Sequence, residues 1–523
     1  MVLYLQKKII QVYIILLLCY TLFPITQQVS GDYIVTQDTK INELDSSLNV
    51  SRLFYQNVIT DNSTIRYLTY LIGDEVLAEP NGFEIYPMSH IFKLELHGLS
   101  DEPIIENVTD DYVLPFHYEF RVDSIGRVHT VYVKENYTLF YSIRGVDGGW
   151  VEEQITNPTE WYAFDPAITL GSDDLPRIVY AVNYNDNADE YWNVTGTLSS
   201  GKSIHYQMLT NSSEWLIFDV GYNHNPNPSS FRGINLQDTK NPGIMVKDGF
   251  THIGYYNRKA IAVEARSQFL RIPEDPTGFT SADFKEYTHE RVYQTAVTAS
   301  VLRRPSIFLT EEGGAMLAYG TLTHGGVVFS YIDDVARMPN KDIRGTDTEW
   351  DNMLVNEDRP REVTSVSGIQ IDGSIYVAYA LYDRTDQEKN IFTHDVYVVS
   401  VEPSRGRIEG TREIGRGRVT QTEKTSYFYP NLSMNEDNQL EVGVIWQNRT
   451  DDDNFGSYRI HIIEFKDIPL DEIDSIYGFI YASVFIGLIV FSWNKLINKI
   501  PEKEKEEEIL PHMINLRDII TKD

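Results

Sequence analysis

One pattern recurs along most of the sequence, and this repeat restricts the fold more than any other feature. Each copy has an alternating apolar stretch, a turn rich in Asp, Asn or Gly, and a second alternating stretch that usually ends in an aromatic residue. The clearest copies span 166–180, 242–255 and 305–319, and weaker ones span 58–70, 115–132, 368–379 and 430–444. The seven copies end about 62 residues apart on average. A repeat of this length indicates a ring or an array of small units.

A third alternating stretch follows each copy and completes a small antiparallel unit. We expect these third strands at 90–96, 138–143, 204–209, 260–265, 327–332, 396–401 and 458–465, with fourth strands at 150–155 and 215–220. An immunoglobulin-like sandwich needs about 100 residues per domain, which is more than one repeat supplies. Three or four strands repeated seven times predict an all-β fold, a seven-bladed β-propeller over residues 32–466.

Ring closure should use the N-terminal segment. The last copy supplies three strands before the chain leaves the repeat region, so its sheet lacks an outer strand. We expect residues 33–36 to pair with the strand at 458–465 and to complete this sheet.

Two apolar runs predict a membrane-anchored surface protein. Lys7 and Lys8 precede an apolar run that ends near residue 25, which is typical of a signal peptide over residues 1–31. A linker at 467–475 leads to an 18-residue run without charge at 476–493, long enough for a transmembrane helix. Acidic residues precede this run and lysines follow it, which places the tail at 494–523 in the cytoplasm. The tail is either disordered or a docking segment for a cytoplasmic partner.

Charge and cysteine content exclude several classes of protein. The net charge is −31, and residues 32–475 hold 69 of the 76 acidic residues but 37 of the 45 basic ones. Such a surface repels phosphate backbones, so nucleic-acid binding is not expected. The single cysteine, Cys19, lies in the predicted leader, which excludes a disulfide framework and a cysteine-rich zinc site.

Eight Asn-x-Ser/Thr sequons lie in the predicted outer segment, which makes a glycoprotein the expectation. Sequons without disulfides suggest an archaeal-like cell surface. The predicted glycosylation sites are Asn49, Asn62, Asn107, Asn136, Asn193, Asn211, Asn431 and Asn448.

Two further motifs have residues that are typical of ligand sites. Residues 196–203 match the Walker A pattern, but that chemistry needs a helix after the loop, and residues 204–209 alternate like a strand. We therefore expect a hairpin loop there. Asp451, Asp452 and Asp453 offer oxygen ligands for Ca²⁺, the one possible cofactor, and the alternative is a solvated acidic loop.

Residues 142–150 carry Ser142, Asp147, two glycines and Trp150 around a predicted hairpin, and Arg271 begins an Arg-Ile-Pro sequence. The first segment resembles the Asp-box turn of sialidase-like propellers, and the second is similar to the segment that holds a substrate-binding arginine in that family. The Asp-box spacing is longer here, and the Arg-Ile-Pro lies in the fourth repeat instead of the first. The resemblance implies a propeller of that general kind and carries over no active site.

These features indicate a cell-surface binding or adhesion protein that recognises an extracellular glycan or protein through a propeller face. No constellation of residues points to catalysis. The alternatives are a surface glycoside hydrolase or lyase of sialidase-like type, which needs paired carboxylates, and a single-pass sensor.

Overall fold

The computed structural model separates the chain into two units, Met1–Asp467 and Ile468–Asp523. The predicted leader, the apolar run 476–493 and the tail lie outside the described residues. Among the residues that are described, no helix has the length and apolar character needed to cross a bilayer. The structure describes residues 34–43, 49–59, 64–73, 90–99, 102–157, 161–184, 203–220, 237–259, 264–280, 283, 290–295, 304–311, 313–321, 326–332, 335, 350–356, 363–371, 373–386, 391–403, 411–419, 425–449 and 455–466.

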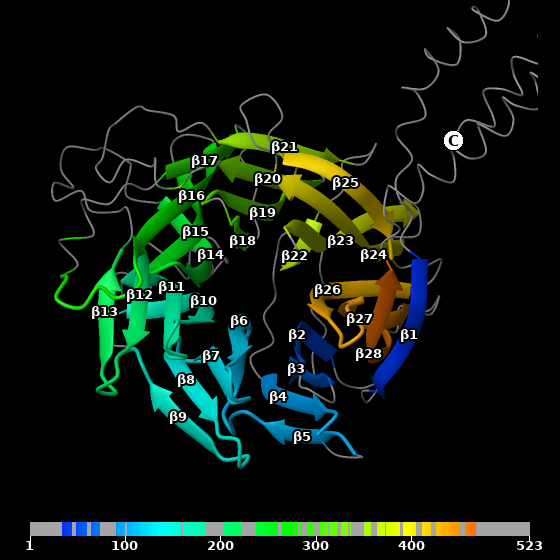
Figure 1. Cartoon of the computed structure of the whole chain (residues 1–523). Coiled ribbons are helices and arrows are strands. Elements are labelled where there is room, and N and C mark those ends of the chain that lie inside the picture. The colour runs from blue at the N-terminus through cyan, green and yellow to red at the C-terminus, as the bar shows by residue number, and fades with distance from the viewer. Residues whose placement is uncertain are drawn as a thin grey trace, which may run out of the picture. The chain divides into compact units, whose positions relative to one another are not determined.

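The described part of the chain is all-β and forms antiparallel sheets (Figure 1). Five sheets have four strands each. They are β10 (Trp161–Leu170), β11 (Pro176–Tyr184), β12 (Ser203–Leu209) and β13 (Trp215–Asp219); β14 (Gln237–Lys247), β15 (Phe250–Lys259), β16 (Glu264–Pro273) and β17 (Glu290–Thr295); β18 (Ser306–Leu309), β19 (Ala315–Thr321), β20 (Gly326–Ile332) and β21 (Asp351–Asn356); β22 (Val363–Ile371), β23 (Ser374–Asp386), β24 (Ile391–Pro403) and β25 (Thr411–Arg418); and β1 (Ile34–Glu43), β28 (Phe455–Lys466), β27 (Leu440–Arg449) and β26 (Thr425–Met434).

The remaining sheet has eight strands and consists of two four-strand groups. A single residue pair, His90 with Val113, joins the groups between β4 and β6. The eight-stranded sheet therefore consists of two repeats that are joined by this one residue pair. Its strands are β2 (Asn49–Ile59), β3 (Thr64–Gly73), β4 (His90–His97) and β5 (Ile104–Asn107), followed by β6 (Val113–Val122), β7 (Val128–Lys134), β8 (Leu139–Arg144) and β9 (Trp150–Gln154).

The N-terminal strand completes the last sheet, as the sequence predicts. β1 pairs antiparallel with β28, and the register runs from Ile34 opposite Lys466 to Glu43 opposite Arg459. The pairing covers the predicted contact and extends beyond it. The first strand of the chain is therefore the outer strand of the sheet that contains the last one.

Apolar side chains join each four-strand group to the next. Ile204 and Ile253 belong to one hydrophobic cluster, as do Phe269 and Leu317, Val327 and Val377, and Ala378 and Val442, so successive sheets share a hydrophobic layer. A further layer brings Ile445 of the last sheet against Leu53 of β2, and two more connect β2–β5 to β6–β9 and β6–β9 to β10–β13. The groups follow one another around a ring with their first strands innermost, a β-propeller-like fold (Figure 1).

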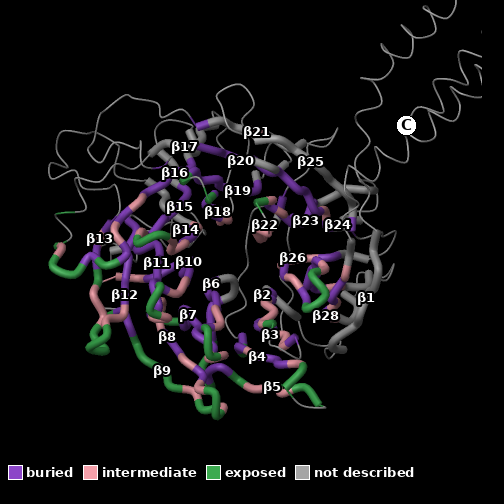
Figure 2. The backbone as a smooth tube through the Cα atoms, viewed as in Figure 1, coloured by how far each residue is buried: buried purple, intermediate pink, exposed green. Residues whose placement is uncertain are grey.

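Burial follows this arrangement. Figure 2 shows buried residues along the strands and exposed residues in the outer turns. The largest buried side chains include Tyr70, Tyr132, Tyr180, Tyr255, Tyr319 and Tyr379, the residues that end six of the sequence repeats. These tyrosines are thus core residues, and their large rings fill the space between sheets.

Seven of the described hairpins share one turn, whereas β14–β15 is joined by a two-residue turn with positive φ at Asp248 and Gly249. In each of the seven, the amide of the fourth residue donates to the carbonyl oxygen of the first, and the fourth residue has a positive φ. This left-handed position is characteristic of a three-residue hairpin loop with a bulge. The residues that occupy it in the described hairpins are Gly126, Tyr137, Gly148, Asp174, Ser213, Gly313 and Asn438.

The structure corrects two expectations about strands. The third strand predicted at 260–265 is displaced, because β16 spans Glu264–Pro273, where Phe269, Leu270 and Ile272 are buried. Fourth strands are more general than the sequence indicated, since β5, β17, β21 and β25 complete their groups as well. Ser203 opens the strand β12, so the Walker A segment is followed by a strand instead of a helix.

Candidate functional site

Two of the innermost strands contain bulges with a polar residue at the irregular position. Asp165 in β10 and Asn241 in β14 each precede a proline, have φ of 48° and 51°, and lie at a register shift in their strand. A bulge re-aims a side chain, and a non-glycine residue at positive φ is strained. Strain of this kind concentrates at functional positions, which directs attention to these two residues.

Asp165 is the centre of a buried cluster drawn from three sheets. His117 Nδ1 of β6 lies 3.0 Å from Asp165 Oδ1, and the Asn241 amide donates to Asp165 Oδ2 at 3.2 Å. Burial alone would raise the pKa of Asp165, but the hydrogen bond and charge of His117, together with Arg304, hold that pKa well below its usual range. Asp165 is therefore a fixed anion.

Arg304, just before β18, joins three sheets through its guanidinium. Its Nη1 lies 2.7 Å from Glu119 Oε2 of β6, and its Nη2 donates to the Pro166 carbonyl of β10 at 2.9 Å. Arg121 Nη2 holds the other oxygen of Glu119 at 2.5 Å. Glu119 is thus paired with two guanidinium groups.

This pairing limits the chemistry of the cluster. A two-carboxylate hydrolase needs one protonated carboxyl as an acid, and the ionised Asp165 cannot serve as one. His117 contacts Asp165 twice through Nδ1, which lies 3.0 Å from Asp165 Oδ1 and also 3.0 Å from the donating Asp165 amide.

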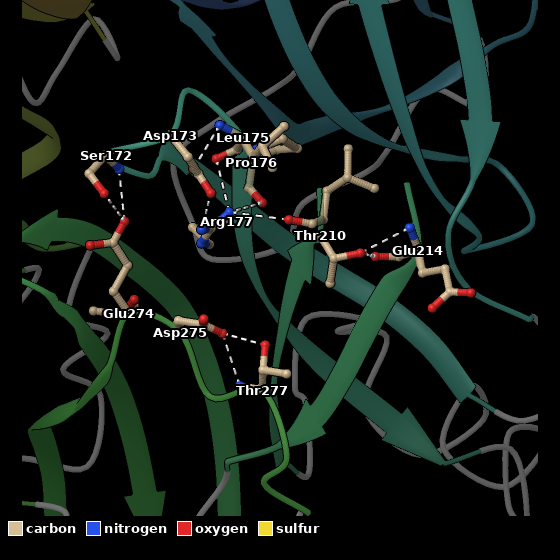
Figure 3. A network of polar contacts seen from close by, with 12 residues as sticks. Ser172, Asp173, Leu175, Pro176, Arg177, Thr210, Glu214, Glu274, Asp275 and Thr277 are labelled. Atoms are coloured by element: carbon tan, nitrogen blue, oxygen red, sulfur yellow. Dashed lines mark hydrogen bonds and ion pairs between the residues drawn. The ribbon is translucent and has the colours of Figure 1, made fainter. Parts of the chain in front are cut away.

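A pocket of about 330 Å³ lies between the sheets β10–β13 and β14–β17 (Figure 3). The β10–β11, β12–β13 and β14–β15 turns and the end of β16 surround it. Most lining side chains are polar, and two apolar ones lie among them. The lining residues are Ser172, Asp173, Arg177, Met208, Leu209, Thr210, Asn211, Gly249, Glu274, Asp275 and Thr277.

Arg177 lines this pocket with a buried side chain, and 2% of the residue's surface is exposed. Its Nη2 donates to Asp173 Oδ2 at 2.9 Å, and its Nη1 lies 3.2 Å from the Leu175 carbonyl oxygen. Asp173 and Arg177 are four residues apart across the hairpin turn, and Asp123 and Arg127 form a pair with the same spacing in the neighbouring repeat. The turn thus fixes the position of the guanidinium.

Carboxylates from the second sheet complete the pocket. Glu274 Oε1 accepts hydrogen bonds from the Ser172 amide at 2.8 Å and the Ser172 hydroxyl at 3.0 Å, which ties the two sheets together (Figure 3). Asp275 is exposed and accepts from the Thr277 amide at 3.0 Å. The side-chain and backbone hydrogen bonds from Thr277 lower the pKa of Asp275, so it is also anionic.

The predicted ligand and modification sites are spread over the ring. Asp451, Asp452 and Asp453, with Asn62 and Asn193, lie outside the described residues, and no group of three metal-ligating side chains is found among the described ones. Asn107, Asn136 and Asn211 are exposed. Asn49 lies in β2 and Asn448 in β27. Asn431 donates its amide to the Leu53 and Tyr429 carbonyl oxygens, at 2.6 and 3.0 Å.

The two segments that resemble sialidase-like propellers lie away from the polar cluster. The Asp-box-like turn joins β8 to β9, and Asp147 Oδ1 accepts from the Gly149 amide at 3.4 Å. Arg271 is on β16, a third strand, where its guanidinium lies 3.5 Å from the centre of the Phe250 ring. Arg271 thus packs within its own sheet.

Sequence reasoning missed the residues that form the cluster and the pocket. His117, Asp165 and Arg304 come from separate repeats, and only the ring brings them together. A signal did exist, since several repeats begin with a proline and Asp165, Asn241 and Arg304 immediately precede one.

No protein-family model matches the chain, and no curated protein matches it. Solved structures with some similarity include a protein of unknown function from Dyadobacter fermentans, with 11% identity, a TM-score of 0.41, and coverage of 83% of this chain and 99% of that one. An α-L-arabinanase from Penicillium chrysogenum complexed with arabinobiose has 11% identity, a TM-score of 0.39, and coverage of 67% and 93%. The hemagglutinin-neuraminidase ectodomain of parainfluenza virus 5 has 7% identity, a TM-score of 0.39, and coverage of 84% and 86%.

Proposed function

We propose that this chain is a membrane-anchored surface protein that binds an extracellular glycan through a seven-bladed propeller. The observation that carries the proposal is the polar pocket between β10–β13 and β14–β17, where charged side chains are held in place by internal hydrogen bonds. A sugar presents hydroxyl groups that both donate and accept hydrogen bonds, so a site for it needs fixed groups of both kinds. Asp173 and Asp275 provide acceptors, and the side-chain amide of Asn211, which also lines the pocket, provides a donor.

The grouping of the strands supports seven blades. The described strands fall into four-strand groups once the eight-stranded sheet is divided at its single bridge, and β1 belongs to the last group. The hydrophobic layers between groups are consistent with a closed ring.

Anchoring rests on the sequence. The uncharged run 476–493, the acidic residues before it and the lysines after it support a single span with the tail inside and the ring outside. The sequons in the ring favour the same placement.

The size of the pocket supports a sugar as the ligand. The pocket volume is at the lower end of the range for small-molecule sites. Met208 and Leu209 supply an apolar surface among the polar groups, which suits the C–H face of a sugar ring. We therefore expect recognition of one or two sugar units within a longer glycan.

The experiment is a glycan-array screen of the purified full-length chain, followed by titration of the best ligand. Asp275→Asn should weaken binding about tenfold, equivalent to ~1.4 kcal/mol, because a charged acceptor is lost. Asp283→Asn is the matched control, since Asp283 is also capped by a threonine amide and hydroxyl but does not line the pocket. Equal affinity of the two variants would place the binding site elsewhere, and binding of proteins but not glycans would reject the ligand class.

Catalysis at the buried cluster is the second candidate, favoured by the close pairing of an imidazole, His117, with a carboxylate, Asp165. Such a pair can take part in proton transfer during glycan hydrolysis or elimination. Release of reducing ends or of unsaturated products from the bound glycan, abolished by His117→Gln but not by Asp275→Asn, would establish an enzyme in place of a binding protein.

A further inference from the structure

The sequon at Asn136 lies in the hairpin turn between β7 and β8, and each of its three residues has an unusual setting. We propose that Asn136 carries an N-linked glycan whose first sugar packs against the rings of Tyr137 and Tyr162. This inference rests on the extracellular placement of the ring in the proposed function. It assigns a modification site and a structural use for the attached sugar.

The Asn136 side chain is positioned for modification. It is exposed, and its Oδ1 accepts a hydrogen bond from the Thr138 amide at 3.1 Å. In the described part of the chain its Nδ2 donates no hydrogen bond, so the atom that would carry the sugar is available. Asn431 is the opposite case, because its Nδ2 donates to two carbonyl oxygens.

Tyr137 occupies a backbone position that suits a small or flexible residue. Its φ is 61°, and the matching position of the other hairpins holds Gly, Asp, Ser or Asn. A bulky residue there is an outlier that needs a compensating role. The Ala163 amide donates to the Tyr137 carbonyl oxygen at 3.0 Å, which fixes the strained residue against β10.

The strain places an aromatic pair beside the sequon. The rings of Tyr137 and Tyr162 lie 5.3 Å apart, and Phe164 packs 5.2 Å from Tyr137 on the buried side. Tyr137 and Tyr162 are half-buried, so each keeps an accessible part. An aromatic face next to an attached sugar can cover its apolar C–H face.

Thr138 is the third residue of the sequon, and its side chain is buried. Its Oγ1 has no hydrogen-bond partner in the described part of the chain. A buried hydroxyl without a partner is unfavourable, and valine has nearly the same shape without that disadvantage. A hydroxyl two residues after the asparagine is, however, what the sequon requires.

The modification is a group transfer from a lipid-linked oligosaccharide phosphate of the host. Asn136 Nδ2 loses one proton and forms a bond to C1 of the first sugar. The bond between C1 and the lipid-phosphate oxygen breaks, and the phosphate leaves with the electron pair. No oxidant or reductant is needed.

The test uses the full-length chain from a host that performs N-glycosylation. Peptide mass spectrometry should find Asn136 modified, and Asn431 unmodified in the same sample. Tyrosine nitration by tetranitromethane, mapped by mass spectrometry, should rise several-fold at Tyr137 and Tyr162 in Asn136→Gln. Tyr112, half exposed and remote from the sequon in sequence, is the internal reference.

Thr138→Val is the second variant, because it abolishes the sequon and preserves the buried shape. It should give the same rise in nitration, whereas Asn211→Gln, which removes another exposed sequon, should not. An unmodified Asn136 beside modified Asn107 or Asn211, or nitration unchanged by both sequon variants, would overturn the inference. Absence of glycan at every sequon would instead count against the extracellular placement.

Discussion

At the scale of single residues, His129 in β7 and His252 in β15 each lie three residues before the tyrosine that ends their repeat. Both are buried, and burial lowers the pKa of each. Asp123 Oδ2 lies 3.2 Å from His129 Nε2 and opposes this lowering, whereas the nearby charge of Arg271 adds to it at His252. The two histidines therefore occupy equivalent positions of the repeat, but the nearby charges of Asp123 and Arg271 act on their pKa values in opposite directions.

His252 should make the fold sensitive to acid. Its pKa is lowered to about 3, so below the unfolded value of about 6.5 the unfolded chain binds a proton that the folded chain excludes. Stability should fall by up to ~1.4 kcal/mol per pH unit between pH 6 and pH 3 from this residue. Thermal unfolding of His252→Gln should show a weaker pH dependence over this window. Identical slopes for variant and wild type would contradict the assignment.

Gly313 occupies the positive-φ position of the shared turn, so a substitution there measures the backbone strain at that position. Its φ is +88°, and a Cβ added there would contact nothing within 4 Å. Gly313→Ala should therefore cost ~1–2 kcal/mol through backbone strain alone. Asn438→Gly, at the matching turn position, should be close to neutral. Chemical denaturation of both variants measures this, and an unaffected Gly313→Ala protein would mean that the turn tolerates an L side chain.

At the scale of elements, the hairpins were predictable because their information is local. Alternation and turn residues located β10–β11, β14–β15 and β18–β19 in the sequence. The fourth strands were harder, as β5 shows: it has four residues and alternates between half-buried and exposed positions, so no apolar run marks it. The candidate site was not predictable in this way, because Asp165, His117 and Arg304 meet only through the ring.

Substitutions of the two partners of the Asp173–Arg177 ion pair, in the turn between β10 and β11, should lower stability by different amounts. Arg177→Met should cost ~2–4 kcal/mol, because the buried guanidinium contacts Asp173 and several carbonyl oxygens that would lose their donor. Asp173→Asn should cost less than ~1 kcal/mol, since a third of that side chain is exposed. Urea unfolding of the two variants compares them. Equal losses would mean that the ion pair, not the guanidinium, stabilises the turn.

At the scale of the whole molecule, closure depends on β1. Deletion of residues 34–43 should expose the outer edge of β28, lower the unfolding temperature and broaden the transition, because the ring loses its only pairing between chain ends among the described strands. Amide hydrogen exchange should increase first in β28. Full protection of β28 in the deletion variant would show that the ring closes without this strand.

The pairing of β1 with β28 also sets the order of events in synthesis. β1 leaves the ribosome first, and its partner follows about 400 residues later. At ~5–20 residues per second, the first strand waits roughly 20–80 s with its hydrogen-bonding edge unpaired. Its sequence is polar, with Gln37, Asp38, Lys40 and Asn42. Such a strand resists aggregation while it waits, so the segment that closes the ring is also suited to being the last to fold.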